Sequence, residues 1–262
     1  RAFGRPEWLG LACRAADFLQ RELWRDGRLL AAWKDGRARL PAYLDDHAFL
    51  LEAMLELLQA GWRDADYRCA VALADALLQH FEDREEGGFF FTAHDHEALI
   101  HRTKPVEDHA TPSGNGVAAF ALGRLALLSG EPRYAASARR ALALFLPDLR
   151  QHPGAHPGLL NVLGDELSPP ALAVLQGPAG ALAARRGPYG RGRTAAPLAQ
   201  TGDGTCQRLG LCRRYLLATH RRPGSPAWHV GQTVESALTS PRYTAYSPFS
   251  LRSESMKAIY VS

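Results

Sequence analysis

The sequence predicts an all-α protein built of helical hairpins, followed by a poorly structured basic tail. Three observations support this prediction. Apolar residues recur at helical spacing through the first three-fifths of the chain, and short polar connections separate these stretches. After Gly177, Pro, Gly and Arg become frequent and sustained apolar faces disappear. We therefore divide the chain into residues 1–177, the helical domain, and residues 178–262, the tail.

Five helices are expected in order, each with one buried apolar face. For the second helix, Asp45 or Asp46 is the expected N-cap and Gly61 the expected end. The fifth helix begins after Pro132, a residue that favours the first helical turn. The expected ranges of the first four are about 8–19, 45–61, 65–81 and 116–128.

A weak internal repeat supports the hairpin arrangement. The pattern Leu9-x-x-Ala12-x-x-x-Ala16 recurs from Tyr67 and again from Ala135, at offsets of 58 and 68 residues. Such an interval suits two helices and their loops. Alanine is abundant in this chain, so a chance match of small residues is the alternative explanation.

Composition places the chain among ordinary globular proteins, because 46% of its 262 residues are hydrophobic and 22% are charged. No apolar run is long enough to span a bilayer, and the first residues lack the apolar core of a signal peptide. We therefore expect a cytoplasmic protein without a membrane partner. Because it begins at Arg1 without Met, we also expect the chain to be a piece of a longer protein.

Positive charge is concentrated in the tail. Residues 178–262 contain 12 Lys plus Arg and 3 Asp plus Glu, a balance of +9; subtraction from the totals of 31 and 27 leaves −5 for the helical domain. The domain is mildly acidic, so nucleic acid is an unlikely partner. The tail is either a flexible basic segment or, as we favour, GC-rich coding sequence read in a shifted frame. Only Leu209 to Ala218 hints at a helix there.

The cysteines predict neither a disulfide framework nor a cofactor. The four cysteines are scattered, and none forms a C-x-x-C pair. Cys206 and Cys212 enclose five residues without a matching second pair, which is a poor zinc pattern. His94-x-His96 also has ligand-like spacing but lacks a third ligand, so no metal is expected; solvated surface groups are the favoured interpretation of these loop histidines.

Three polar segments carry the candidate functional residues. They lie near expected helix starts or in the loops between hairpins, and they read YLDDHAFLL (43–51), FEDREEGGFFFT (81–92) and RTKPVEDHATPSGNGVAA (102–119). In the second segment, Gly87-Gly88 permits a sharp turn with positive φ, and the three phenylalanines after it are expected to form core and rim. Tyr43 or Trp33 could instead stack on a sugar ring.

The third segment leads directly into an apolar helix. A helix start offers unpaired N–H groups and a partial positive charge, so polar side chains there can line a pocket. The alternative is that Ser113 or Asn115 merely caps the helix. The candidates in this segment are Arg102, Lys104, Asp108, Ser113 and Asn115.

In order and spacing, the three segments resemble bacterial YyaL-type proteins and their animal spermatogenesis-associated relatives, over roughly residues 8–177. The resemblance implies a thioredoxin-like domain upstream, outside this chain. It also implies an (α/α)6 toroid like that of N-acylglucosamine 2-epimerases and six-hairpin glycosidases. His47 departs from the family, which usually has tyrosine there. A ring of six hairpins needs more than about 300 residues, so we expect about half a ring.

The resemblance further implies a carbohydrate-active or carbohydrate-binding domain, epimerase- or glycosidase-like, with a sugar as its ligand. Asp46 and Asp108 are the candidate acid–base couple, because they come from different loops. The structural alternative makes one of the two a helix cap and the other an ion-pair partner of Arg102 or Lys104. The expected substrate-binding residues are Asp45, His47, Arg102, Lys104, Ser113 and Asn115.

A non-catalytic scaffold that presents the thioredoxin-like domain to partners is the second hypothesis. The two hypotheses differ in one structural feature. An enzyme needs paired acid–base groups that face one pocket, whereas a scaffold has its carboxylates satisfied by neighbouring Arg and Lys.

Overall fold

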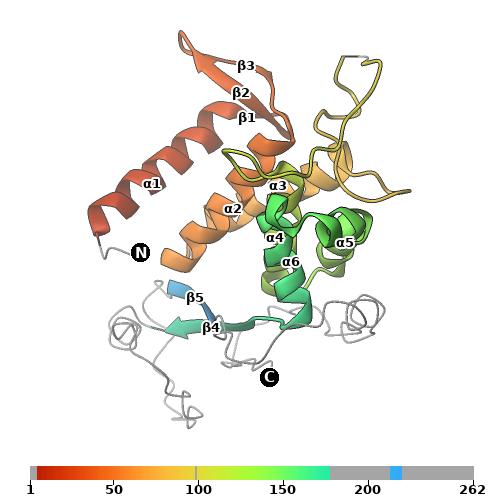
Figure 1. Cartoon of the computed structure of the whole chain (residues 1–262). Helices are drawn as coiled ribbons and strands as arrows, with labels where there is room; N and C mark the ends of the chain where they lie inside the picture. The colour runs from red at the N-terminus through yellow and green to blue at the C-terminus, as the bar shows by residue number, and fades with distance from the viewer. Residues whose placement is uncertain (1–4, 98, 178–212, 220–262) are drawn as a thin grey trace.

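The computed structural model describes residues 5–97, 99–177 and 213–219, and this part of the chain is mostly helical (Figure 1). The five expected helices are all present, and the segment 157–167, for which no helix was expected, forms a sixth. In chain order the helices are α1 (Pro6–Phe18), α2 (Leu44–Ala60), α3 (Asp64–Ala76), α4 (Gly114–Ser129), α5 (Pro132–Gln151) and α6 (Pro157–Leu167).

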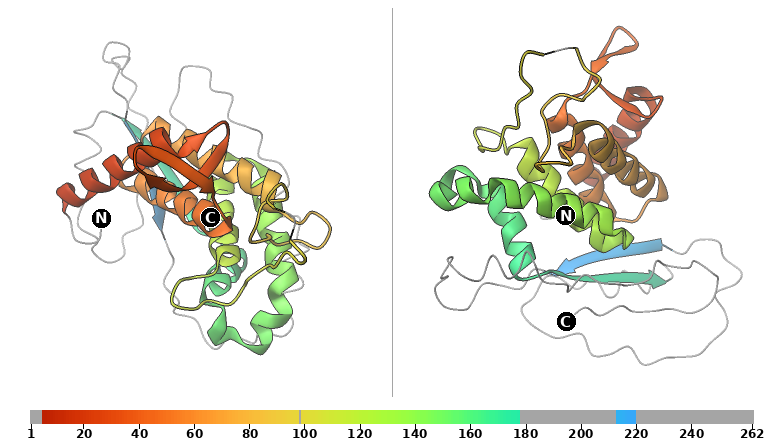
Figure 2. Two further views of the ribbon diagram at one scale, coloured as in Figure 1. Left: turned by 90° about the horizontal axis from the view of Figure 1, so that it is seen from above. Right: turned by 90° about the vertical axis from the view of Figure 1, so that its right-hand side faces the viewer.

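The helices from α2 onward pack in two rows. In one row α2 contacts α4, and α4 contacts α6; on the other side α3 packs on α2, and α5 packs on α4 (Figures 1 and 2). Short connections join α2 to α3 and α4 to α5, so each pair forms a hairpin. Large side chains between the rows are fully buried, among them Leu51, Leu58, Leu73, Leu122 and Leu142.

The ends of three helices differ from the expectation. Tyr43, not Asp45 or Asp46, is the N-cap of α2, which places the two aspartates inside its first turn. α1 and α3 each continue into a π-helical segment, Leu19–Leu23 and Leu77–Phe81. The apolar face of α1 was expected to be buried, and this prediction is wrong at Trp8 and Leu11, whose side chains are 53% and 56% exposed. The reason is that α2 covers only part of α1.

A small antiparallel sheet interrupts the all-α pattern between α1 and α2. It consists of β1 (Trp24–Arg25), β2 (Arg28–Lys34) and β3 (Arg37–Pro41), in that order. Asp-Gly pairs at 26–27 and 35–36 form its two turns, and all four residues have positive φ. Asp-Gly is a strong hairpin signal, so these dipeptides could have predicted the sheet.

A second, two-stranded sheet joins the helical domain to the described part of the tail. β4 (Ala171–Gly177) pairs antiparallel with β5 (Arg213–Thr219), with Ala171 opposite Thr219 and Gly177 opposite Arg213. The helix hinted at from Leu209 to Ala218 is therefore wrong for residues 213–218, which are extended. The other expectations for residues 178–262, including the shifted frame and the Cys206–Cys212 pair, lie outside the described residues.

Among the described helices, none combines the length and the apolar character required to cross a bilayer.

Candidate functional site

The three polar segments meet around the first turns of α2 and α4. The Leu44 N–H donates to the Phe91 carbonyl (3.0 Å), which joins the first segment to the second. The Asn115 side chain joins the third segment to the second through Phe89. The Asp45 carboxylate lies against Gly114, which joins the first to the third. Residues far apart in the sequence thus form one polar cluster, which we call the rim cluster.

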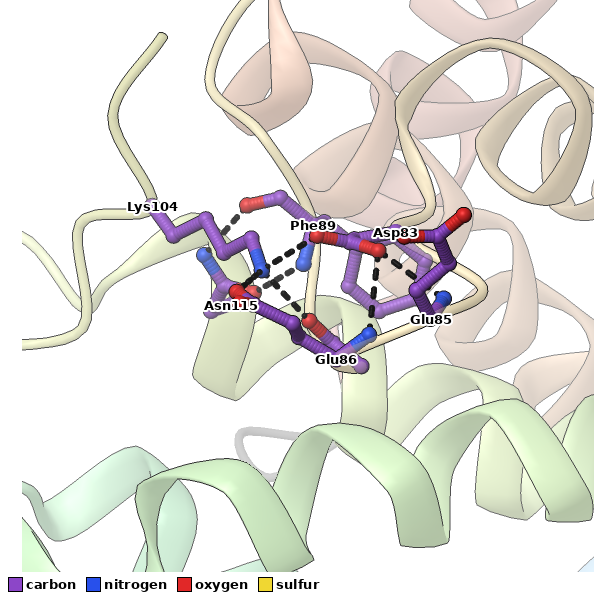
Figure 3. A network of polar contacts seen from close by, with 7 residues as sticks. Asp83, Glu85, Glu86, Phe89, Lys104 and Asn115 are labelled. Atoms are coloured by element: carbon purple, nitrogen blue, oxygen red, sulfur yellow. Dashed lines mark hydrogen bonds and ion pairs between the residues drawn. The ribbon is translucent and has the colours of Figure 1, made fainter.

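Asn115 holds the rim cluster together from a fully buried position. Its Oδ1 accepts from the Phe89 N–H (2.7 Å), and its Nδ2 donates to the Phe89 carbonyl (2.9 Å) (Figure 3). The same Nδ2 also donates to the Pro105 carbonyl (2.8 Å). These three bonds satisfy both ends of the amide and leave little capacity for a ligand. The expected substrate-binding residue Asn115 is therefore placed as a clamp between two loop segments.

Lys104 neutralises a turn that the second segment forms. Its Nζ donates to Asp83 Oδ2 (2.7 Å), to Glu86 Oε2 (3.3 Å) and to the Gly87 carbonyl (3.0 Å) (Figure 3). The other Asp83 oxygen accepts from the N–H groups of Glu85 and Glu86. Lys104 and the backbone donors together lower the pKa of Asp83. The amino group is thus committed to this turn.

The glycine pair in this turn has positive φ, as expected, with values of +91° at Gly87 and +72° at Gly88. A Cβ atom at Gly87 would lie 2.6 Å from the Arg140 carbonyl oxygen of α5, so only glycine lets the turn approach that helix. Phe89 after the turn is fully buried, whereas Phe90 and Phe91 are partly buried, which matches the expected core and rim.

The two candidate catalytic carboxylates are bound by backbone N–H groups. Asp46 Oδ2 accepts from the Tyr43 N–H (2.8 Å), which closes the start of α2 and agrees with the capping alternative. Asp108 bridges the starts of two helices, because its Oδ1 accepts from the Ser113 N–H (2.9 Å) and its Oδ2 from the Gly158 N–H (2.7 Å). The other part of the alternative, an ion pair of Asp108 with a nearby cation, is wrong among the described residues.

Ser113 begins α4, and Asp45 of α2 lies against that helix start. Ser113 is the N-cap, and its Oγ accepts from the Gly116 N–H (3.2 Å), as the capping alternative predicted. Asp45 Oδ1 is buried and has no well-formed hydrogen bond. Burial and the neighbouring Asp46 raise the pKa of Asp45, while the Gly114 N–H partly offsets this effect. Burial of the Asp45 carboxyl therefore favours its neutral form.

His47 is a buried residue of α2, and its surroundings favour the neutral imidazole. Its Nδ1 lies 2.8 Å from the Tyr43 carbonyl, so this nitrogen carries the proton, and its Nε2 has no partner. Burial lowers the pKa of His47. Its ring packs on Phe81, 4.8 Å between centroids, and thus fills a core position beside the rim cluster.

Aromatic rings and a guanidinium complete the rim cluster. Tyr43 stacks on Phe91 with 4.9 Å between ring centroids, and His96 tilts onto Tyr43 at 5.5 Å. Arg102 donates to the Thr92 carbonyl and lies 4.0 Å above the Phe90 ring. The motif analysis missed the stacking of Phe91 and the involvement of Thr92 and His96.

Unpaired polar atoms gather in this region. Eight buried side-chain N or O atoms of the described residues lack a hydrogen bond, and native proteins normally pair such atoms. Five of the eight lie in the first turn of α2 and the loop beside it: Asp45 Oδ1, His47 Nε2, Thr92 Oγ1, His96 Nδ1 and Arg102 Nε.

A group of possible metal ligands lies near the rim cluster. His80, His94 and Asp95 each offer one side-chain ligand atom, and these three atoms all lie within 4.8 Å of one another. The sequence pattern identified His94 but not His80, because the third ligand comes from the end of α3 and not from the same loop.

The described thiols do not favour nucleophilic chemistry. Cys13 and Cys69 are free and half-buried. Burial, together with the nearby Asp66, raises the pKa of Cys69 to about 12, so it remains a thiol at neutral pH.

No family model matches the chain. The chain is similar to spermatogenesis-associated protein 20 of Homo sapiens, with 29% identity over 171 residues, and to that of Mus musculus, with 28% over 173 residues. These regions cover 61% and 62% of the chain but 22% of each relative. The Rattus norvegicus protein is 31% identical over 122 residues. The similarity indicates distant homology, and the chain spans about a fifth of the length of the human and mouse relatives it matches.

Proposed function

We propose that the chain is part of a carbohydrate-binding helical domain, an arc of an (α/α)6 ring in a protein that carries a thioredoxin-like domain elsewhere. The two-row packing supports the ring, because alternate helices of an α/α ring line its inner and outer layers. In this arrangement α2, α4 and α6 form one layer, and α3 and α5 form the other. The loops of the rim cluster then surround one mouth of the ring.

The gathering of unpaired polar atoms beside an aromatic stack carries this proposal. Sugars present several hydroxyl groups together with an apolar ring face, so their sites combine hydrogen-bonding groups with aromatic rings. The rim cluster offers the Asp45 carboxyl, the Nε2 lone pair of His47 and the Thr92 hydroxyl next to Tyr43. His96 covers the Tyr43 ring and must turn away before a sugar can stack on it.

The bonding of the motif carboxylates favours sugar binding over catalysis. An acid–base couple needs oxygens that reach the substrate, but both oxygens of Asp108 and one of Asp46 accept from backbone N–H groups. In the proposal, Asp45 contacts the sugar, and His47 supports it from the core position behind it. Arg102, Lys104, Ser113 and Asn115 hold the surrounding loops, and Asp46 and Asp108 hold the helix starts.

A thermal-shift titration of the full chain with monosaccharides, amino sugars and disaccharides tests the proposal, since a ligand of the native state raises the melting temperature. The test variant is Asp45→Asn, which keeps the side-chain shape. The matched control is Asp148→Asn, an exposed aspartate on α5. A sugar-dependent rise in the wild type and the control that Asp45→Asn abolishes supports the proposal. Equal rises in all three proteins, or no rise with any sugar, refute it.

A non-catalytic scaffold is the second candidate, favoured by the satisfied state of most carboxylates in the rim cluster. Asp83 is bound by Lys104, and Asp46 and Asp108 are bound by backbone donors. A scaffold should bind the thioredoxin-like domain of its own full-length protein in isothermal titration calorimetry. A titration in which no heat of binding is measured would reject this function.

A further inference from the structure

Two histidines and one aspartate lie together at the edge of the rim cluster. His80 lies in the π-helical segment that continues α3, and His94 and Asp95 follow the second polar segment. The His94 N–H donates to the His80 carbonyl (2.8 Å), which fixes the spacing of the two residues. Their rings meet edge to face with centroids 5.2 Å apart, and His94 Nδ1 lies 3.5 Å from Asp95 Oδ1. Neutral imidazole and carboxylate are ligands that zinc and its neighbours accept.

Arg28 of β2 already places a positive charge against this group. Its guanidinium donates to both oxygens of Asp95, at 2.8 Å each, and its Nη1 lies 2.9 Å from His80 Nδ1. Since arginine can only donate, His80 Nδ1 accepts and carries no proton. A metal requires the same state of its ligands: an unprotonated imidazole nitrogen and an ionised carboxylate. The bidentate pairing of Arg28 with both oxygens of Asp95 is the geometry of an ionised carboxylate.

We propose that His80, His94 and Asp95 form a binding site for a divalent transition metal such as Zn²⁺, and that the metal and the Arg28 guanidinium compete for it. Both cations use the lone pairs of Asp95, and the two positive charges repel each other at contact distance. Three protein ligands leave a coordination position open to water or to a small anionic ligand. Metal binding releases the Arg28 side chain from Asp95. It thereby breaks the two hydrogen bonds that join β2 to the loop around Asp95.

Co²⁺ is the probe for this site, because its visible absorption reports the ligands and Zn²⁺ displaces it from nitrogen and oxygen sites. The full chain is titrated with Co²⁺ as wild type, His94→Ala and Asp95→Asn. The matched control is His101→Ala, which removes an exposed loop histidine outside the group. We expect one Co²⁺ per chain, at least about tenfold weaker binding in both test variants, and no change in the control.

The competition has its own test in Arg28→Gln, which removes the resident charge and leaves all three ligands in place. This variant should bind Co²⁺ more tightly than the wild type, and Zn²⁺ should bleach the absorption in both. If Asp95→Asn fails to fold, His94→Ala alone tests the ligands, because the His94 side chain is exposed and its removal disturbs little packing. Equal affinities of the wild type and His94→Ala overturn the site, and weaker binding by Arg28→Gln overturns the competition.

Discussion

Replacing Asn115 by alanine should unfold the rim cluster before it affects any other part of the domain. The substitution removes one acceptor and two donors, and it leaves the N–H and carbonyl of Phe89 and the carbonyl of Pro105 without their partner. Phe89 and Asn115 are both fully buried, so water does not readily replace the lost amide. The two second-segment bonds are the more costly ones, because that backbone also anchors the turn around Gly87.

Each buried group left without a partner costs about 1–3 kcal/mol, and partial relaxation reduces the sum for three groups to about 3 kcal/mol. For a domain of about 150–250 residues, 1 kcal/mol corresponds to a shift of about 2–4 °C in Tm, so we expect a fall of about 6–12 °C. Differential scanning calorimetry of the full chain measures it.

The control for this measurement is Asn161→Ala, an exposed asparagine on α6 that should change the free energy of unfolding by less than about 0.5 kcal/mol. Asn115→Asp provides a second comparison. It keeps the acceptor for the Phe89 N–H but turns an oxygen toward two carbonyls, so it should be at least as destabilised as the alanine variant. A loss below about 1 kcal/mol for Asn115→Ala would refute the clamp.

Three further substitutions test other parts of the same region. Gly114→Ala places a Cβ atom 2.1 Å from Asp45 Oδ1, so it should lower the urea midpoint, and adding Asp45→Ala should restore part of the loss; no recovery would exclude this clash as the cause. Lys104→Met should cost about 1–2 kcal/mol at pH 7. Lys104 lowers the folded pKa of Asp83. The stabilisation from this pair is therefore complete above the ordinary aspartate pKa and disappears as the pH falls through the folded pKa of Asp83. The free energies of unfolding of the variant and the wild type should then converge in acid. Burial lowers the folded pKa of His47, so the wild type should lose stability as the pH falls below about 6.5. The stability of His47→Phe should depend less on pH over the same range.

The helices were predictable because local signals coincide with tertiary packing. α5 begins at Pro132, and the side chains expected to face inward, such as Tyr134 and Leu142, are buried. α4 ends at Ser129 before a glycine, and α2 ends one residue before Gly61. Each of these boundaries depends on residues within one or two turns, which a sequence displays directly.

The sheet of β1 to β3 was missed for a different reason. No element was expected for the apolar residues around Trp24 and Trp33, which lie between two strong helical patterns. The Asp-Gly pairs at 26–27 and 35–36 contained the information, because a two-residue turn with positive φ at both positions strongly favours a hairpin. The exposure of α1 was also not predictable, since a helical face reveals its apolar character but not its partner.

The sequence by itself determined the helical hairpins, a possible cap at Ser113 or Asn115 and the grouping of polar residues into three segments, because helix boundaries and caps are local. Only the tertiary structure decided what those polar residues do. Asp46 and Asp108 bind backbone N–H groups, Lys104 binds Asp83, and His80 joins His94 and Asp95. Hydrogen-bond partners lie on elements that are distant in sequence, and whether a side chain is free for a ligand depends on the donors and acceptors that packing brings to it.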